Sequence, residues 1–107
     1  MKIFKNNRKE ADAVVAFFTP KTSGLENVEM GSAKMEANSE SNWAAHQGDE
    51  YSYVVTGALT CYAREDGQEK SYQVKAGDAI CTPAGQEHKS VNTSSEDCFV
   101  IWFEVTK

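Results

Sequence analysis

Two histidines are the only imidazole side chains among the 107 residues of this chain. Glu50 follows His46 by four residues, and His88 comes shortly after a turn formed by Pro83 and Gly85. Two imidazoles and one carboxylate suit a divalent transition metal such as iron, nickel, manganese or zinc. The sequence therefore contains one candidate metal site, made of His46, Glu50 and His88.

The spacing of His46 and Glu50 restricts how these two side chains could share an ion. Four residues of a straight strand span about 13 Å, which is too far for one metal. On a helix the two side chains would lie on one face, but Gly48 and the β-rich run from Tyr51 disfavour a helix. We therefore expect a bend or bulge at residues 47–49, which glycine permits at low steric cost.

Each of these residues also has an ordinary structural interpretation. A histidine in a strand is commonly hydrogen-bonded or placed on a polar face, and Glu50 beside Asp49 could be surface charge. Further oxygen ligands could come from Gln47, Asp49 or Gln86, and no spacing distinguishes among them. The two histidine segments considered together favour a shared site.

The composition excludes several classes of function. A net charge of -5 argues against nucleic acid, because binding to it depends on phosphate neutralisation by lysine and arginine. No apolar stretch approaches the ~18 residues of a membrane span, and the ordered parts of a signal peptide are missing. We therefore expect a cytoplasmic protein with no membrane partner.

Cys61, Cys81 and Cys98 are odd in number and lack the CxxC spacing, so neither a disulfide framework nor a zinc knuckle is indicated. All three lie in apolar or β-branched runs, where cysteine usually behaves as a small buried hydrophobe. Cys81 is a partial exception, because it lies near Pro83 and the second histidine.

Short β-rich segments separated by turn residues cover most of the chain. Glu65-Asp66-Gly67 predicts a hairpin turn, because Asp-Gly supplies the positive φ angles that such a turn needs. Residues 36–42 are expected to form a loop or an edge. The expected strands are residues 13–19, 28–35, 51–56, 58–63, 71–75, 79–82, 88–92 and 98–105. This pattern predicts one all-β domain, a sandwich or barrel, over residues 1–107, with N-terminal strands in roughly 1–42.

The second histidine segment, residues 77–92, resembles the second sequence motif of the cupin family, Gly-x5-Pro-x-Gly-x2-His-x3-Asn. All five marked positions match. The matching residues are Gly77, Pro83, Gly85, His88 and Asn92.

The first histidine segment, residues 44–57, is similar in part to the first cupin motif, Gly-x5-His-x-His-x3,4-Glu-x6-Gly. His46, Glu50 and Gly57 fit this motif. Its leading glycine falls on Asn38 and its first histidine on Ala44.

The resemblance implies a jelly-roll barrel (a double-stranded β-helix), often dimeric, with a metal bound near one end of its cavity by His46, Glu50 and His88. A cupin ordinarily offers three histidines and one glutamate, so Ala44 removes one ligand. The expected function is a metal-dependent small-molecule enzyme, an oxygenase or an isomerase. The alternatives are a metal-free or weakly metallated module that binds a small ligand without catalysis, and a former catalytic barrel kept for assembly or regulation.

Strand alternation predicts which side chains face the cavity. If Glu50 faces inward, Ser52 does too and Tyr51 and Tyr53 face outward; from His88, the same rule turns Ser90 and Asn92 inward. The residues expected to line the cavity are Ser52, Ser90, Cys81 and Gln86.

The C-terminal run, residues 99–105, is apolar on both faces. Such a strand fits sheet packing or a subunit interface, which favours a homodimer. Trp43 and Trp102 are expected in the core or at that interface.

Overall fold

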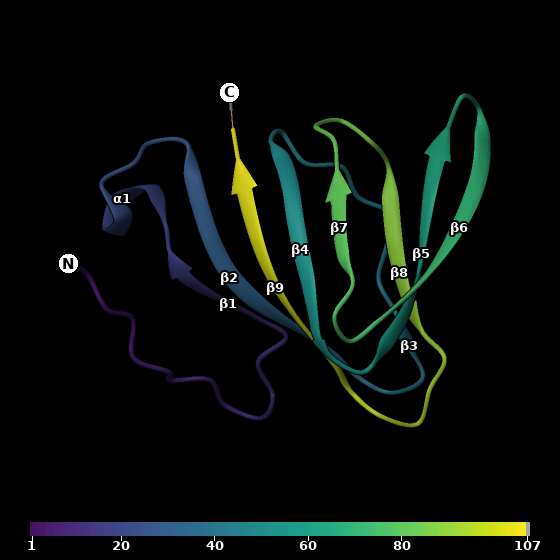
Figure 1. The fold of residues 1–107 in the computed structure, drawn as a ribbon, viewed down its shortest axis with the longest axis horizontal. Helices are drawn as coiled ribbons and strands as arrows, with labels where there is room; N and C mark the ends of the chain where they lie inside the picture. The colour runs from purple at the N-terminus through teal and green to yellow at the C-terminus, as the bar shows by residue number, and fades with distance from the viewer. Residues whose placement is uncertain (107) are drawn as a thin grey trace.

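Two antiparallel sheets face each other in a computed structural model that describes residues 1–106 (Figure 1). The five-stranded sheet has the order β1-β2-β9-β4-β7 and the four-stranded sheet the order β3-β8-β5-β6. The elements are β1 (Val14–Phe18), α1 (Pro20–Ser23), β2 (Val28–Met35), β3 (Ser39–Glu40), β4 (Asp49–Thr56), β5 (Ala58–Glu65), β6 (Gln68–Lys75), β7 (Ala79–Thr82), β8 (His88–Asn92) and β9 (Cys98–Val105). This arrangement is a jelly roll, so the predicted all-β fold class is confirmed.

The strand boundaries differ from the expected ones at a few places. β4 begins at Asp49, so Glu50 is already part of the strand, and β6 begins at Gln68, directly after the turn. The turn itself is as predicted, with positive φ angles of 51° at Asp66 and 75° at Gly67. The short helix α1 was not expected. Among residues 1–106, no helix is long and apolar enough to cross a bilayer.

The hydrophobic core lies between the sheets at the end where they converge, below the open upper end in Figure 1. Val54, Leu59 and Cys98 form its buried centre. Residue 54 is near the end of β4, whereas Glu50 is near the beginning of the same strand. The candidate metal site is therefore displaced from the core toward the other end of the barrel.

Asn92, the last residue of the second motif, is 1% exposed and belongs to this packed end. Its side-chain nitrogen donates to the carbonyls of Met35 at 3.1 Å and Glu96 at 2.8 Å. Its side-chain oxygen accepts from the amide and the hydroxyl of Ser94. The prediction that Asn92 faces inward is correct, and its contacts make it a structural anchor for the β8–β9 loop.

The cysteines divide by position in their strands. Cys98 is buried and Cys61 is half-buried, but Cys81 is exposed. Cys81 pairs in register with Tyr51, whose side chain is 47% exposed, so both lie on the outer face of the five-stranded sheet. The expectation of burial is therefore wrong for Cys81.

The N-terminal segment covers part of this outer face. The Arg8 guanidinium donates hydrogen bonds to the Ser32 hydroxyl and the Asp12 carbonyl, and it lies 5.8 Å from the centre of the Phe99 ring. Lys34 donates to the carbonyl of Glu10. Strand β9 is central in this sheet, between β2 and β4. Its inner face borders the core and the cavity and its outer face is partly covered by the N-terminal segment, which explains why its sequence is apolar on both faces.

Candidate metal centre

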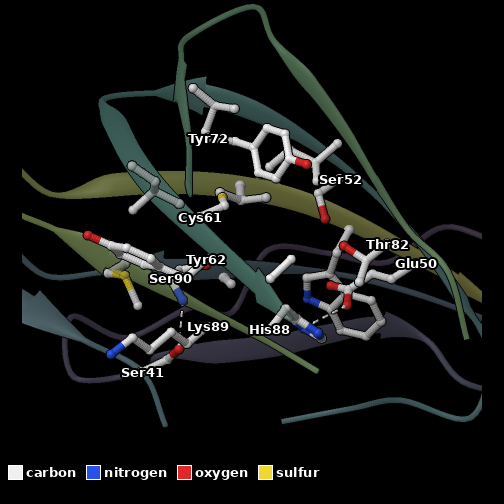
Figure 2. A pocket seen from close by; sticks show the side chains of 18 of the residues that line it. Ser41, Glu50, Ser52, Cys61, Tyr62, Tyr72, Thr82, His88, Lys89 and Ser90 are labelled. Atoms are coloured by element: carbon white, nitrogen blue, oxygen red, sulfur yellow. Dashed lines mark hydrogen bonds and ion pairs between the residues drawn. The ribbon is translucent and has the colours of Figure 1, made fainter. Parts of the chain in front are cut away.

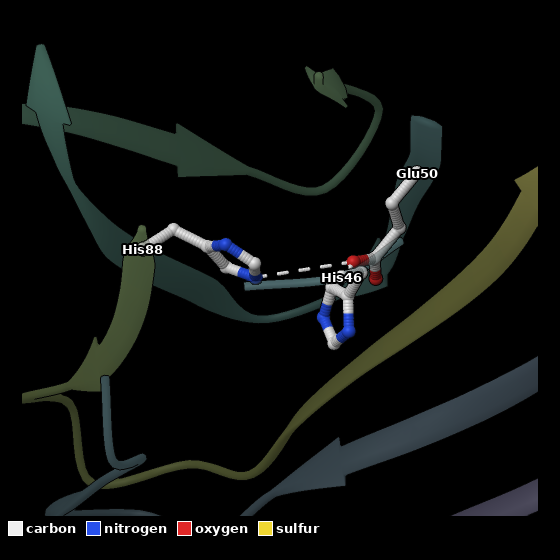
Figure 3. A group of neighbouring side chains, drawn as sticks. All are labelled: His46, Glu50 and His88. Atoms are coloured by element: carbon white, nitrogen blue, oxygen red, sulfur yellow. Dashed lines mark ion pairs between the residues drawn. The ribbon is translucent and has the colours of Figure 1, made fainter. Parts of the chain in front are cut away.

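Three side chains from separate parts of the chain meet at one point (Figure 3). His46 precedes β4, Glu50 lies in β4 and His88 begins β8. One ligand atom from each lies within 4.8 Å of the other two. The Glu50 Oε2 atom is 3.1 Å from His46 Nε2 and 3.9 Å from His88 Nε2, and the two imidazole centres are 4.9 Å apart. The structure therefore brings together the three residues that the spacing predicted.

A bend at Gln47 and Gly48 allows His46 and Glu50 to approach each other, as expected. The Gly48 amide donates to Glu104 Oε1 at 3.2 Å. A Cβ atom at this position would lie 2.5 Å from the Val105 carbonyl oxygen. Only glycine fits here without moving β9, so the close contact between the bend and β9 determines the residue type.

The turn that precedes His88 is attached to the first histidine segment by hydrogen bonds. The Gly85 amide donates to the His46 carbonyl at 2.9 Å. The Ala84 amide donates to Asp49 Oδ1, also at 2.9 Å. These contacts explain why the two sequence motifs act as a unit: the turn of the second holds the main chain of the first.

Ala44, which replaces the first histidine of the motif, pairs directly with His88. Each residue's amide donates to the other's carbonyl at 2.9 Å. Residues paired in this way place their side chains on the same face. Ala44 therefore lies next to the site but supplies no ligand atom.

Asn38, at the motif's leading glycine position, has a φ of 55°. Asparagine is one of the few residues other than glycine that adopts this left-handed conformation readily. Asn38 therefore adopts a conformation that glycine also adopts readily, whereas Ala44 removes a functional group.

Trp43 was expected in the core or at an interface, and it is half-buried on the surface of the four-stranded sheet. The Arg64 guanidinium lies 4.0 Å from the centre of its ring, and the Lys89 ammonium 5.4 Å. Arg64 also pairs with Glu87 at 2.7 Å. These contacts hold the segment that leads to His46 against the sheet.

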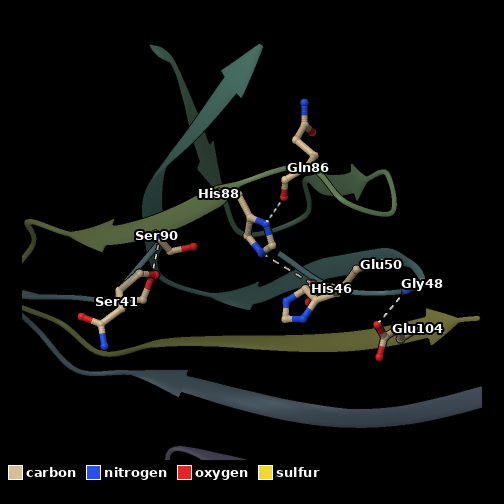
Figure 4. A network of polar contacts seen from close by, with 9 residues as sticks. Ser41, His46, Gly48, Glu50, Gln86, His88, Ser90 and Glu104 are labelled. Carbon is tan, nitrogen blue, oxygen red and sulfur yellow. Dashed lines mark hydrogen bonds and ion pairs between the residues drawn. The ribbon is translucent and has the colours of Figure 1, made fainter. Parts of the chain in front are cut away.

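The His88 ring is oriented by a hydrogen bond to a main-chain carbonyl, visible in Figure 4. Its Nδ1 atom lies 2.9 Å from the Gln86 carbonyl oxygen. A carbonyl can only accept, so Nδ1 is the donor in this contact, which leaves Nε2 as the ring nitrogen available to bind a metal. Histidines that bind metals commonly have this arrangement, in which the other ring nitrogen donates to a carbonyl.

The donor set fits a divalent transition metal. Such ions bind nitrogen and oxygen ligands at about 2.1 Å, so two ligands are at most about 4.2 Å apart. The observed limit of 4.8 Å requires only small side-chain rotations. Glu50 and His88 are 21% and 22% exposed and His46 is 41% exposed, which leaves the site open on the side of His46.

The three residues lie beside a cavity of ≈ 670 Å³ between the sheets, to which Glu50 and His88 contribute directly (Figure 2). All four residues expected to line it, Ser52, Ser90, Cys81 and Gln86, border it. Cys81 borders the cavity from β7, the edge strand of its sheet, although its side chain lies on the outer face of that sheet. Trp102 lines the cavity as well, although it was expected in the core or at an interface.

Two residues in the cavity wall were not predicted from the sequence. The Tyr72 hydroxyl donates to Glu65, with its oxygen 2.9 Å and 3.0 Å from the two carboxylate oxygens. This hydrogen bond raises the pKa of the Tyr72 phenol. Only the register of the predicted hairpin could have indicated that the two side chains share a face.

Comparison with known proteins supports the fold. The family model described as Cupin domain matches residues 31–104, which include both motifs. The acireductone dioxygenase of Rhodopseudomonas palustris (strain TIE-1) is 43% identical over 47 residues. That match covers 44% of this chain and 28% of the relative, so the chain corresponds to less than a third of its length.

Solved structures agree with the topology. An oxalate decarboxylase from Lactobacillus farciminis, in a formate complex, superposes with a TM-score of 0.79 at 16% identity, over 96% of this chain and 31% of the other. A cupin-2 domain containing protein from Shewanella frigidimarina superposes with a TM-score of 0.60 at 26% identity, over 74% and 71% of the two chains. At 16% identity the first of these similarities concerns the fold alone.

Proposed function

Because this chain belongs to the cupin family, we propose that it is a metal-dependent enzyme acting on a small molecule. His46, Glu50 and His88 would hold the metal. The observation that carries the proposal is the convergence of these three donors beside a cavity, with the His88 tautomer set for ligation.

Among metal-dependent reactions we favour an oxygenation over an isomerisation. Two histidines and one carboxylate with open coordination positions are the ligand set of non-haem Fe(II) oxygenases. The partial similarity to a dioxygenase points the same way. When bound, the metal would supply Lewis-acid polarisation of a substrate oxygen and a site for dioxygen.

The protein side chains have distinct parts in this proposal. Glu50 places its carboxylate between the two imidazoles, 3.1 Å from His46 and 3.9 Å from His88, and would be the oxygen ligand of the set. The Gln86 carbonyl holds the Nδ1 proton of His88. Ile80, Val100 and Trp102 give the cavity apolar walls, which exclude water from a bound substrate.

The cavity supports a small substrate of moderate polarity. Its volume of ≈ 670 Å³ is within the range of about 300–1,000 Å³ that is typical of small-molecule sites. Ser52 and Ser90 place small side chains with hydroxyl groups among the apolar walls, which leaves space and hydrogen bonds for polar substituents.

A second candidate is a binding module that works with little or no metal. Ala44 removes a ligand, and the 41% exposure of His46 leaves its imidazole open to solvent. In that case the imidazoles would hydrogen-bond an anionic or sugar-like ligand. Binding that persists in the presence of EDTA would favour this candidate, whereas the enzyme requires the metal.

Metal analysis tests the leading proposal. Protein purified without added metal and then incubated with Fe(II), Ni(II), Mn(II) or Zn(II) should retain close to one equivalent of one of these ions. His88→Ala should lose it, and the control Ser90→Ala, two residues further along β8, should keep it. A metal content near zero for all four ions in the unmodified protein would overturn the proposal.

We also propose that the partner of this chain is a second copy bound through the outer face of the five-stranded sheet. Four exposed side chains of β4 and β9 lie there, Tyr51, Tyr53, Val55 and Phe103, and the rings of the first and last are 6.5 Å apart. All four are uncharged, so two chains of net charge -5 could meet here without opposing like charges. The N-terminal segment already covers the adjacent part of this face.

Light scattering during gel filtration tests this proposal. The native protein should elute at twice the chain mass of 11.8 kDa. Tyr53→Lys should yield the monomer, whereas the control Thr60→Lys, on the opposite sheet, should leave the dimer intact. A native protein that elutes as a monomer at micromolar concentration would contradict the proposal.

A further inference from the structure

A second group of polar side chains lies in the cavity wall near the candidate metal centre. Tyr72 donates its hydroxyl proton to Glu65. The Gln86 side-chain nitrogen lies 3.5 Å from Glu65 Oε1, and the Lys70 ammonium 3.5 Å from Glu65 Oε2. Glu65 is therefore the centre of the group, and it is 26% exposed.

Strand pairing places this group at the level of His88. Ala63 pairs with His88 on one side and with Lys70 on the other. Tyr72 pairs with Cys61, which precedes Ala63 by two residues. The Tyr72 hydroxyl nevertheless contacts Glu65, which follows Ala63 by two residues. The Tyr72 and Glu65 side chains therefore extend toward each other along the strand direction and meet near the level of His88, and both line the cavity.

Gln86 connects the two groups. Its main-chain carbonyl accepts from the His88 ring, and its side-chain amide contacts Glu65. A molecule bound at the metal centre would therefore have the Glu65 group as a near neighbour.

The hydrogen-bonding capacity of the group is specific. Because Tyr72 uses its only proton on Glu65, its oxygen keeps acceptor capacity, and the carboxylate also has acceptor capacity beyond its contacts with Tyr72, Gln86 and Lys70. The ammonium of Lys70, which is 47% exposed, offsets part of the charge from the solvent side. This wall of the cavity can therefore accept hydrogen bonds more readily than it can donate them.

We propose that Glu65 and Tyr72 form a substrate subsite that accepts a hydrogen bond from a hydroxyl or amino group, while oxygen atoms of the same molecule bind the metal. The inference rests on the proposed function and specifies its substrate class. The substrate is a small oxygen chelator that carries a hydrogen-bond donor a short distance from its chelating group.

Pairs of hydroxamates test the subsite on the zinc-loaded protein. The two members of a pair have the same chain length, and one ends in a methyl group where the other ends in an amino group. The amino members are glycine, β-alanine and 6-aminohexanoic hydroxamates. Affinities are measured by calorimetry for the native protein and for the variants Tyr72→Phe and Glu65→Gln/Tyr72→Phe. Circular dichroism verifies that each variant is folded.

For at least one of the three chain lengths, the amino member should bind about tenfold more tightly than its methyl partner, as expected for a charge-assisted hydrogen bond. In the double variant this ratio should fall below twofold, with the affinity of the methyl member unchanged. Equal affinities at every length, or a ratio that survives in the double variant, would overturn the subsite. A purely structural role of the Tyr72–Glu65 hydrogen bond would change both members of a pair equally.

Failure of the metal proposal would be recognised separately. If zinc itself does not bind, the same pairs are compared on the metal-free protein. There the ratio between amino and methyl members, and its loss in the double variant, still decide whether the subsite exists.

Discussion

Replacing Ala44 by histidine should strengthen metal binding, because this position lies next to the three candidate ligands. The main chains of Ala44 and His88 exchange two hydrogen bonds of 2.9 Å. In such a pair the Cα atoms are about 5.5 Å apart and the side chains share a face. Ala44 is exposed, so a larger side chain has room and the fold should tolerate it.

The expected gain follows from the number of ligands. The native site offers three donors within 4.8 Å of one another, and Ala44→His adds a fourth. Loss of an outer partner of a metal ligand typically costs 10- to 100-fold in affinity, and a direct ligand should contribute at least as much. We therefore expect Ala44→His to tighten Zn(II) or Ni(II) binding by about 10- to 100-fold, equivalent to about 1.4–2.8 kcal/mol.

Competition with a coloured chelator measures this change at a fixed pH. Ala44→Phe is the matched control, because it introduces a flat ring of similar width that has no ligand nitrogen. A dissociation constant for Ala44→His within twofold of the native value would refute the placement of Ala44 beside the ligands. Equal gains for Ala44→His and Ala44→Phe would refute the role of the imidazole.

Three further predictions concern the framework. Asn92→Ala removes four hydrogen bonds to a buried side chain, and at about 1 kcal/mol each urea unfolding should show a loss of about 3–4 kcal/mol; a loss below about 1 kcal/mol would contradict it. Gly57→Ala combines a φ of 86° with a Cβ atom 2.8 Å from the Asp97 carbonyl oxygen, so it should lower the free energy of unfolding by about 1–3 kcal/mol. Gly67→Ala, with a φ of 75° but no atom within 4 Å of its Cβ, should cost less because it carries the backbone strain alone, and equal losses for the two variants would contradict the role of the close contact. Burial raises the pKa of the Cys61 and Cys98 thiols and so reduces their reactive thiolate fraction. At pH 8 iodoacetamide should therefore label the exposed Cys81 before the other two. Mass spectrometry that finds another order of labelling would refute this.

The sequence alone predicted much of the site, because the bends that present its ligands are local and the motif spacing pairs the two segments. Gly48 and the Pro83–Gly85 turn indicated where the main chain bends, and these bends bring His46 and Glu50 toward His88. The remaining link, the hydrogen bond from Gly85 to the His46 carbonyl, connects two segments that motif spacing had already paired.

The features that could not be predicted depend on register and on long-range contacts. Cys81 faces outward because it pairs with Tyr51, and the apolar character of its neighbours gave no sign of that pairing. The contact of Tyr72 with Glu65 follows from the diagonal reach of one side chain along a hairpin. Residues 8–12 cover the outer face of the sheet through contacts of Arg8. The sequence around Arg8 has no hydrophobic periodicity that could have predicted these contacts.

The central claim is that His46, Glu50 and His88 bind one divalent metal ion. An anomalous-difference map from crystals grown with Ni(II) or Zn(II), recorded at the absorption edge of the metal, tests it most directly. The account predicts one dominant peak about 2.0–2.3 Å from one ligand atom of each of the three residues. A map without a peak at this position, or with its dominant peak elsewhere, would contradict the account.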